Sequence, residues 1–124
     1  MSHITSIQTK MNDINCIKKS LDNLGYVYEE NSFAHGYAQS KIQGDLVIKR
    51  SGCFDIAIIM EGGTYIVKAD WWKSDISQKD FINELMQEYS AVKIEKEINS
   101  SGKFRMIGDR EKLADGTQRI RITY

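Results

Sequence analysis

The architecture of this chain follows from residues 45–69, which read DLVIKRSGCFDIAIIMEGGTYIVKA. Three segments rich in apolar and β-branched residues predict strands: Asp45–Arg50, Cys53–Met60 and Thr64–Ala69. Two glycine-containing dipeptides, Ser51-Gly52 and Gly62-Gly63, separate these segments, and two-residue links of this kind favour hairpin turns. We therefore predict three consecutive antiparallel strands.

The two turns also predict the strand register, because a two-residue loop pairs the residues that flank it. Arg50 then faces Cys53, and Glu61 faces Thr64. Alternation assigns one side of the sheet to Phe54, Ile56, Ile58 and Met60 with Tyr65, Val67, Ala69 and Trp71, and the other side to Asp55, Ala57 and Ile59 with Ile66, Lys68, Asp70 and Trp72. A strand that is apolar on both sides is expected to be central, so Cys53–Met60 should lie inside the sheet.

The preceding part of the chain predicts a strand, a helix and further extended segments. Ile4–Gln8 has the pattern of a first strand, and Asn12 is placed to cap a helix that ends at Gly25. The apolar residues of this helix recur at helical spacing: Ile14, Ile17, Leu21 and Leu24. Cys16 lies off that stripe, so we expect it to be partly exposed. Tyr26–Glu29 and Phe33–Lys41 are expected to be extended.

A second helix begins after Ser77, which forms a capping box with Asp80. One broad apolar stripe follows and predicts a helix that covers the sheet: Phe81, Ile82, Leu85, Met86, Tyr89, Val92 and Ile98. The chain then forms a hairpin from Lys103–Lys112 and Thr117–Tyr124. The predicted fold is a single α+β domain over residues 1–124, an antiparallel, mainly meandering sheet with two helices packed on one face.

Composition limits the classes of function. Seventeen basic residues balance seventeen acidic ones, so no net field favours nucleic acid or an anionic membrane. Cys16 and Cys53 lack zinc-ligand spacing, and the two histidines are isolated in sequence. The sequence lacks the glycine-rich phosphate, dinucleotide, serine-elbow and zincin motifs. We therefore expect a protein without a membrane span, metal or cofactor, and favour a non-enzymatic function.

A binding surface is predicted at the end of the third strand, where Asp70, Trp71, Trp72 and Lys73 follow one another. An exposed aromatic residue at this position would serve as a binding platform, whereas a packed one would only close the sheet edge. His3, His35 and Tyr37 are weaker candidates for the same protein-binding surface.

Two alternatives remain open at the level of sequence. In the hairpin, basic residues alternate with apolar ones, so Lys103, Arg105, Arg119 and Arg121 would contact nucleic acid or simply form a solvated face. The predicted register also places Asp55 across from Asp70, and two close carboxylates are the usual arrangement for general acid and base catalysis.

Several segments together resemble a known family. They are Met1-Ser2-His3, Leu24-Gly25-Tyr26, Gly44-Asp45-Leu46-Val47, Ala69-Asp70-Trp71-Trp72 and the long helix with Tyr89. The chain is similar along essentially its whole length to the hypothetical chloroplast reading frame thirty-five family of plastids and cyanobacteria. The resemblance implies a compartment and not a reaction: the plastid stroma, with plastid encoding, or the cytoplasm in a cyanobacterium. The partner it leaves open is an unknown protein of that compartment.

Overall fold

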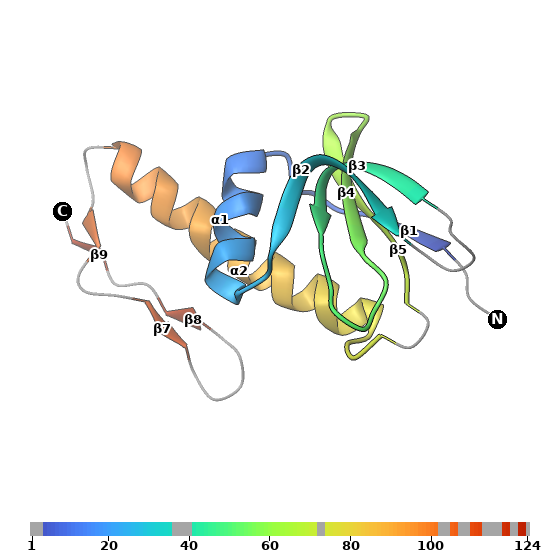
Figure 1. Ribbon diagram of the computed structural model, residues 1–124. Coiled ribbons are helices and arrows are strands. Elements are labelled where there is room, and N and C mark those ends of the chain that lie inside the picture. Colours follow the sequence, from blue (N-terminus) through green and yellow to red (C-terminus); the bar gives the residue numbers. More distant parts are fainter. Residues whose placement is uncertain are drawn as a thin grey trace.

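Five antiparallel strands form the main sheet of the computed structural model, in the order β1-β5-β4-β3-β2. The structure describes residues 4–35, 41–71, 74–101, 105–106, 110–112, 118–119 and 122–123. The sheet strands are β1 (Ile4–Gln8), β2 (Tyr28–His35), β3 (Lys41–Ile48), β4 (Ile56–Glu61) and β5 (Thr64–Asp70). The helices are α1 (Ile14–Leu24) and α2 (Gln78–Ser101), which pack on one side of the sheet (Figure 1). The predicted α+β class is confirmed.

The turn at Gly62-Gly63 has the predicted register. Glu61 pairs with Thr64 and Ile59 with Ile66, and both glycines have positive φ, 64° and 92°. Positive φ at both central residues is what a type I′ hairpin turn requires. The predicted faces of β4 and β5 are therefore confirmed, and β4 is the central strand of the five.

The two-residue turn predicted at Ser51-Gly52 is wrong. β3 ends at Ile48, which pairs with Ile56, so residues 49–55 form a longer loop and Arg50 does not pair with Cys53. The physical reason lies in Asp55, whose side chain accepts a hydrogen bond from the backbone N–H of Arg50 at 3.2 Å. This hydrogen bond joins the two ends of the loop, so residues 49–55 do not continue the pairing of β3 and β4.

The hairpin of β2 and β3 bends over the face of the sheet opposite the helices (Figure 1). Pairing is interrupted at Asn31, which has a positive φ of 50°, and Ala34 is buried against Val47 and Ala57. A Cβ atom at Gly44 would lie 2.9 Å from the Leu46 carbonyl oxygen, so only glycine fits at this bend. The bent hairpin thus covers the second face of β4, which explains why this strand carries apolar residues on both faces.

Helix α1 begins one residue later than predicted. Asp13 is the N-cap and accepts hydrogen bonds from the N–H groups of Asn15 and Cys16, whereas the N–H of Asn12 donates to the Tyr89 hydroxyl at 3.2 Å. Gly25 ends the helix with a positive φ of 83°, as predicted. The expectation that Cys16 is partly exposed is wrong, since it is only 2% exposed. A single helix stripe cannot reveal this burial, because α1 packs against α2 as well as against the sheet.

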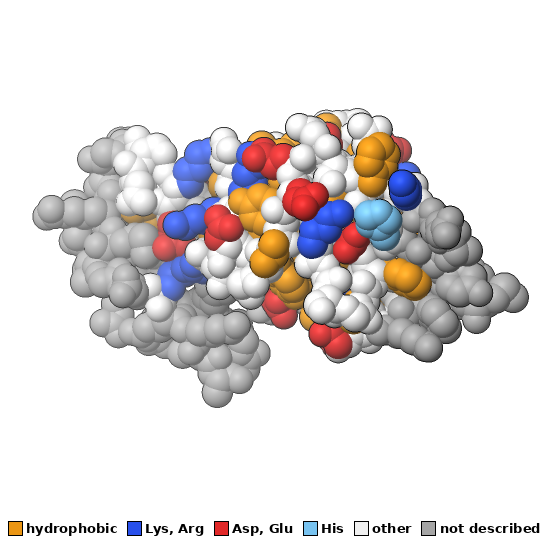
Figure 2. Space-filling view, viewed as in Figure 1, with side chains coloured by type: hydrophobic (Ala, Val, Ile, Leu, Met, Phe, Trp, Pro, Cys, Tyr) orange, Lys and Arg blue, Asp and Glu red, His pale blue; other side chains and the backbone are white. Residues whose placement is uncertain are grey.

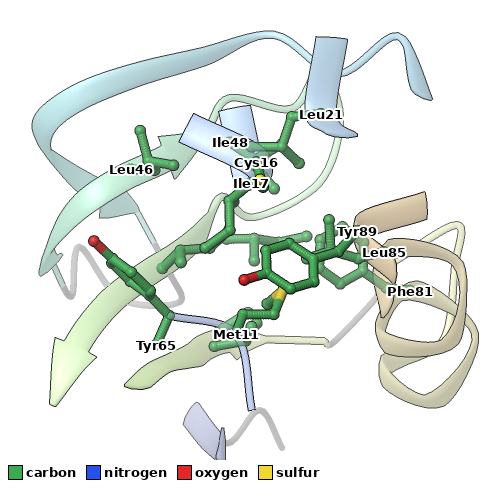
Figure 3. Packing of buried hydrophobic residues seen from close by; sticks show 14 of the residues in the cluster. Met11, Cys16, Ile17, Leu21, Leu46, Ile48, Tyr65, Phe81, Leu85 and Tyr89 are labelled. Carbon is green, nitrogen blue, oxygen red and sulfur yellow. The ribbon is translucent and has the colours of Figure 1, made fainter. Parts of the chain in front are cut away.

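Helix α2 covers the sheet as predicted. Ser77 Oγ accepts a hydrogen bond from the N–H of Asp80 at 3.1 Å, which is one half of the predicted capping box. Phe81 and Leu85 are fully buried, and Tyr89 and Val92 are 7% exposed. Figure 3 shows Phe81, Leu85 and Tyr89 meeting residues of α1 and of the strands in one core. Among the described residues, no helix is both long and apolar enough to cross a membrane.

Asp13 also joins the two helices, and its replacement tests this link. Its Oδ2 lies 2.6 Å from Lys96 Nζ and 3.5 Å from Lys93 Nζ. The hydrogen bond to Lys96 holds the pKa of Asp13 well below its usual value of 3.8. We expect Asp13→Ala to cost about 1 to 2 kcal/mol of unfolding free energy and Asp13→Asn, which keeps a capping oxygen, clearly less. Urea denaturation measures both values.

The pH dependence of that link has a definite sign. Because the folded pKa of Asp13 is depressed, its charge contributes stability above the unfolded pKa and loses it as pH falls toward the folded pKa. The stability difference between the wild type and Asp13→Asn should therefore shrink below about pH 4. A difference that stayed constant down to about pH 2.5 would show that the ion pairs contribute nothing.

Candidate functional site

One end of the sheet brings together several predicted site residues. Ala69 of β5 pairs with Ile56 at the start of β4, and Asp70 pairs with Ile4 at the start of β1. The loop 49–55 meets Ser74 and Asp75, which precede α2, at this end. We call the following set the sheet-end surface: His35, Lys49, Arg50, Asp55, Asp70, Trp71, Ser74 and Asp75.

Arg50 fastens the two loops to each other. Its Nη1 donates to Ser74 Oγ at 3.2 Å, and its Nη2 forms an ion pair with Asp75. The Arg50 side chain is only 10% exposed, whereas that of Asp75 is 73% exposed. The contact therefore fixes the loops while leaving an acidic group at the surface.

Asp55 is the structural centre of the sheet-end surface. Its Oδ2 accepts a hydrogen bond from the backbone N–H of His35 at 3.0 Å, its Oδ1 accepts one from Arg50, and its own N–H donates to the His35 carbonyl oxygen. Burial raises the pKa of Asp55, but the hydrogen bonds from His35 and Arg50 outweigh it and hold that pKa below its usual value. The carboxylate is thus ionised at neutral pH and ties the tip of β2 to the loop before β4.

We call the hydrogen bonds of Asp55 to His35 and Arg50 the Asp55 clamp, and this clamp leaves the His35 side chain exposed to solvent. Its Nδ1 lies 3.2 Å from Asp55 Oδ2, and its side chain is 58% exposed. Lys49 contacts the same carboxylate oxygen, with Nζ 3.6 Å from Asp55 Oδ2 and 3.0 Å from the Phe33 carbonyl oxygen. Figure 2 shows a histidine among basic and acidic side chains on this face. Because Asp55 engages Nδ1, the imidazole offers Nε2 to a binding partner.

The contacts of Asp55 favour a structural role over the predicted role in acid and base catalysis. β4 begins at Ile56, and the Asp55 carboxylate is bound by His35, Arg50 and Lys49. Asp70 is 5% exposed and pairs along the backbone with Ile4. A general acid at neutral pH needs a raised pKa, whereas that of Asp55 is lowered. The arrangement is that of a structural carboxylate.

The tryptophan segment is only partly described. Trp71 packs against Phe81 with ring centroids 5.7 Å apart and borders the main core, as its position on the strand predicts. Four of the predicted binding residues lie outside the described part of the chain: His3, Tyr37, Trp72 and Lys73. Of the predicted set, the structure therefore brings His35, Asp70 and Trp71 to one end of the sheet.

The C-terminal hairpin has the predicted antiparallel pairing where it is described. β6 (Arg105–Met106) pairs with β9 (Ile122–Thr123), and β7 (Glu111–Lys112) pairs with β8 (Gln118–Arg119). Arg119 stands opposite the acidic Glu111 in this register, and Arg105 stands opposite Thr123. Lys103 and Arg121 lie outside the described residues. The described pairing thus gives the nucleic-acid alternative no added support.

Sequence reasoning missed a charged cluster between the helices. Arg110 Nη2 lies 2.7 Å from Glu88 Oε2, and Arg110 Nε lies 2.7 Å from Glu95 Oε1. Asn23 Nδ2 also donates to Glu88 at 2.9 Å. These groups line a cavity of about 750 Å³ between α1 and α2. No short motif signals the cluster, because its members come from three separate parts of the chain.

The described residues contain no group of three or more His, Cys, Asp or Glu side chains placed to hold a metal ion. His35 and Asp55 are the one histidine–carboxylate contact at the sheet-end surface within these residues. The exposed imidazole is placed to form a hydrogen bond with a partner through Nε2.

Comparison with known proteins places the chain in a family. Relatives named Uncharacterized protein ycf35 occur in Guillardia theta and Pyropia yezoensis, each 30% identical over 82% of this chain and 82% of the relative. A third, from Cyanophora paradoxa, is 26% identical over 89% of this chain and 98% of the relative. These names confirm the predicted chloroplast-reading-frame family and support a plastid-encoded protein. No solved structure matches the chain. Residues 20–121 match the model described as Protein of unknown function (DUF1257), and the chain belongs to that family.

Proposed function

We propose that this protein is a small non-enzymatic binding or assembly module of the plastid stroma, and that a protein partner contacts its sheet-end surface. The observation that carries the proposal is the exposed His35 imidazole held at Nδ1 by a nearly buried carboxylate. A side chain that is fixed before binding loses little conformational entropy when a partner arrives. By orienting the His35 ring, the Asp55 carboxylate therefore favours binding of a protein partner.

The surroundings of His35 support the same conclusion. Arg50 and Asp75 tie the adjoining loops together, so the surface keeps its shape without a partner. Lys49 adds a cationic group beside the imidazole, at 28% side-chain exposure. Together these groups suit a polar partner surface that carries carbonyl or carboxylate acceptors.

Co-purification with matched variants tests the proposal. Tagged wild type, His35→Ala and Gln87→Ala would be recovered from the native plastid, where Gln87 is an exposed residue of α2 away from the sheet-end surface. We expect one stromal protein to accompany the wild type and Gln87→Ala, and to fall about tenfold with His35→Ala, the loss expected for a residue central to an interface. Equal recovery with all three proteins, or recovery only from membranes, would refute the proposal.

A further inference from the structure

The two edges of the main sheet differ in how they are protected. β2 forms one edge, carries Glu29 and Glu30, and is interrupted at Asn31, where φ is positive. Charges and local distortions of this kind block pairing with a further strand. β1 forms the other edge and reads ITSIQ, without a charge or proline. Within the described part of the chain, no strand pairs with the outer side of β1.

The hydrogen-bonding pattern shows which groups of β1 face outward. The N–H of Thr9 donates to the Tyr65 carbonyl oxygen, and these residues are opposite each other when the register of β1 and β5 is continued. Antiparallel strands alternate between bonded and non-bonded pairs. Thr5 and Ile7 therefore bond to β5, and the backbone N–H and C=O groups of Ile4, Ser6 and Gln8 point away from the sheet.

We propose that the β1 edge pairs with β1 of a second copy of this chain, antiparallel about a two-fold axis at Ser6. Ser6 then pairs with Ser6 of the second copy, and Ile4 with its Gln8, so every outward donor meets an acceptor. Thr5 of one copy stands opposite Ile7 of the other, a β-branched pair that favours sheet packing. The five-stranded sheets of the two copies become one continuous sheet.

The sequence of β1 favours a second copy of the chain as the strand that pairs with this edge. ITSIQ is uncharged, so antiparallel self-pairing places no like charges opposite each other. Ile4 is 47% exposed and would gain a partner across the new strand pair. Pairing of five-residue strands buries far less than the roughly 1,200 Å² of a stable interface, so the dimer is weak and depends on concentration. The sheet-end surface contains no residue of β1, so either proposal can fail alone.

A proline and an alanine at the same position test the backbone pairing. Ser6→Pro removes an outward N–H without touching the bonds to β5, whereas Ser6→Ala keeps that N–H. Sedimentation would follow both variants and the wild type from about 1 μM to about 1 mM, with circular dichroism confirming folding. We expect the wild type and Ser6→Ala to dimerise and Ser6→Pro to stay monomeric. A monomeric wild type at the highest concentration, or a folded Ser6→Pro that dimerises equally well, would overturn the inference.

Oxidative cross-linking gives a second test that does not depend on the proline variant. In a Cys53→Ser background, Ser6→Cys places two thiols on residues whose Cα atoms are about 5.5 Å apart, within disulfide range. Gln8→Cys is the matched control, because the two copies of residue 8 would be about 14 Å apart. Cys16 is 2% exposed and stays protected. We expect Ser6→Cys to cross-link and Gln8→Cys not to, and equal cross-linking of both would contradict the register.

Discussion

Replacing Asp55 with alanine is expected to lower the unfolding free energy by about 2 to 4 kcal/mol, because three groups lose their acceptor at once. The N–H groups of His35 and Arg50 and the His35 ring all bind this carboxylate, whose side chain is 9% exposed. Buried donors without acceptors carry a large desolvation penalty. The same change should also increase hydrogen exchange at the His35 and Arg50 amides, since it releases the hairpin tip from the loop before β4.

The pH dependence of the Asp55 effect follows from its lowered pKa. The folded pKa lies below the ordinary 3.8, so the carboxylate contributes its full stability above about pH 4 and loses it as pH falls through the folded pKa. Asp55→Asn keeps one acceptor oxygen and should fall between the wild type and Asp55→Ala. The gap between the wild type and Asp55→Asn should narrow from about pH 7 to about pH 3 in urea denaturation.

Glu29→Gln is the matched control for Asp55. Glu29 also contacts Lys49, at 3.8 Å, but its side chain is 57% exposed. An exposed ion pair contributes little, so we expect a change of less than about 0.5 kcal/mol. If Asp55→Ala lowered the unfolding free energy no more than Glu29→Gln, the hydrogen bonds of Asp55 would not stabilise the fold. The orientation of His35 could then not be attributed to them.

Local signals were sufficient to predict much of the fold. Ser77 and Asp80 cap α2, Gly25 ends α1, and Gly62-Gly63 forms the turn between β4 and β5. Each depends on residues close in sequence, where backbone geometry and capping chemistry leave few choices. Once the Gly62-Gly63 turn is correct, the faces of β4 and β5 follow from alternation.

The errors arose where distant residues override a local preference. Ser51-Gly52 has the composition of a tight turn, but Asp55 binds His35, which is twenty residues away in sequence. Cys16 lies off the apolar stripe of α1, yet α2 buries it. Neither contact leaves a mark in the periodicity of its own segment, so sequence patterns alone could not predict them.

The candidate site was predictable from the sequence only in part. The parity of Trp71 correctly predicts its contact with the core. Strand order alone would place His35 at the other end of the ladder from Asp70, since Tyr28 is the β2 residue that is level with Ile48 and Ile56. The contact between Asp55 and His35 depends on the bend of the β2–β3 hairpin, which brings the tip of β2 to the loop before β4. That bend gives the Asp55 carboxylate a histidine partner, which the strand register did not predict.

Phe81→Ala is expected to lower the unfolding free energy by about 3 to 5 kcal/mol, a large part of the stability of a domain of this size. Phe81 is fully buried and lies between Tyr26 and Trp71, with ring centroids at 5.6 Å and 5.7 Å. It therefore joins α2 to the segment after α1 and to the end of β5. Removing the ring leaves a cavity at the point where the helix covers the sheet, and urea denaturation measures the loss.

Two further variants keep this prediction testable if Phe81→Ala fails to fold. Phe81→Leu preserves most of the apolar volume and should cost about 1 kcal/mol. Ile94→Ala removes an apolar side chain from the same helix, but Ile94 is 47% exposed, so we expect a change within about 0.5 kcal/mol. Tryptophan emission should shift to longer wavelength in Phe81→Leu and not in Ile94→Ala, since Phe81 packs against Trp71 whereas Ile94 is largely exposed. If both variants behaved alike, α2 would not cover the sheet through Phe81, and Trp71 would be free to act as a binding platform.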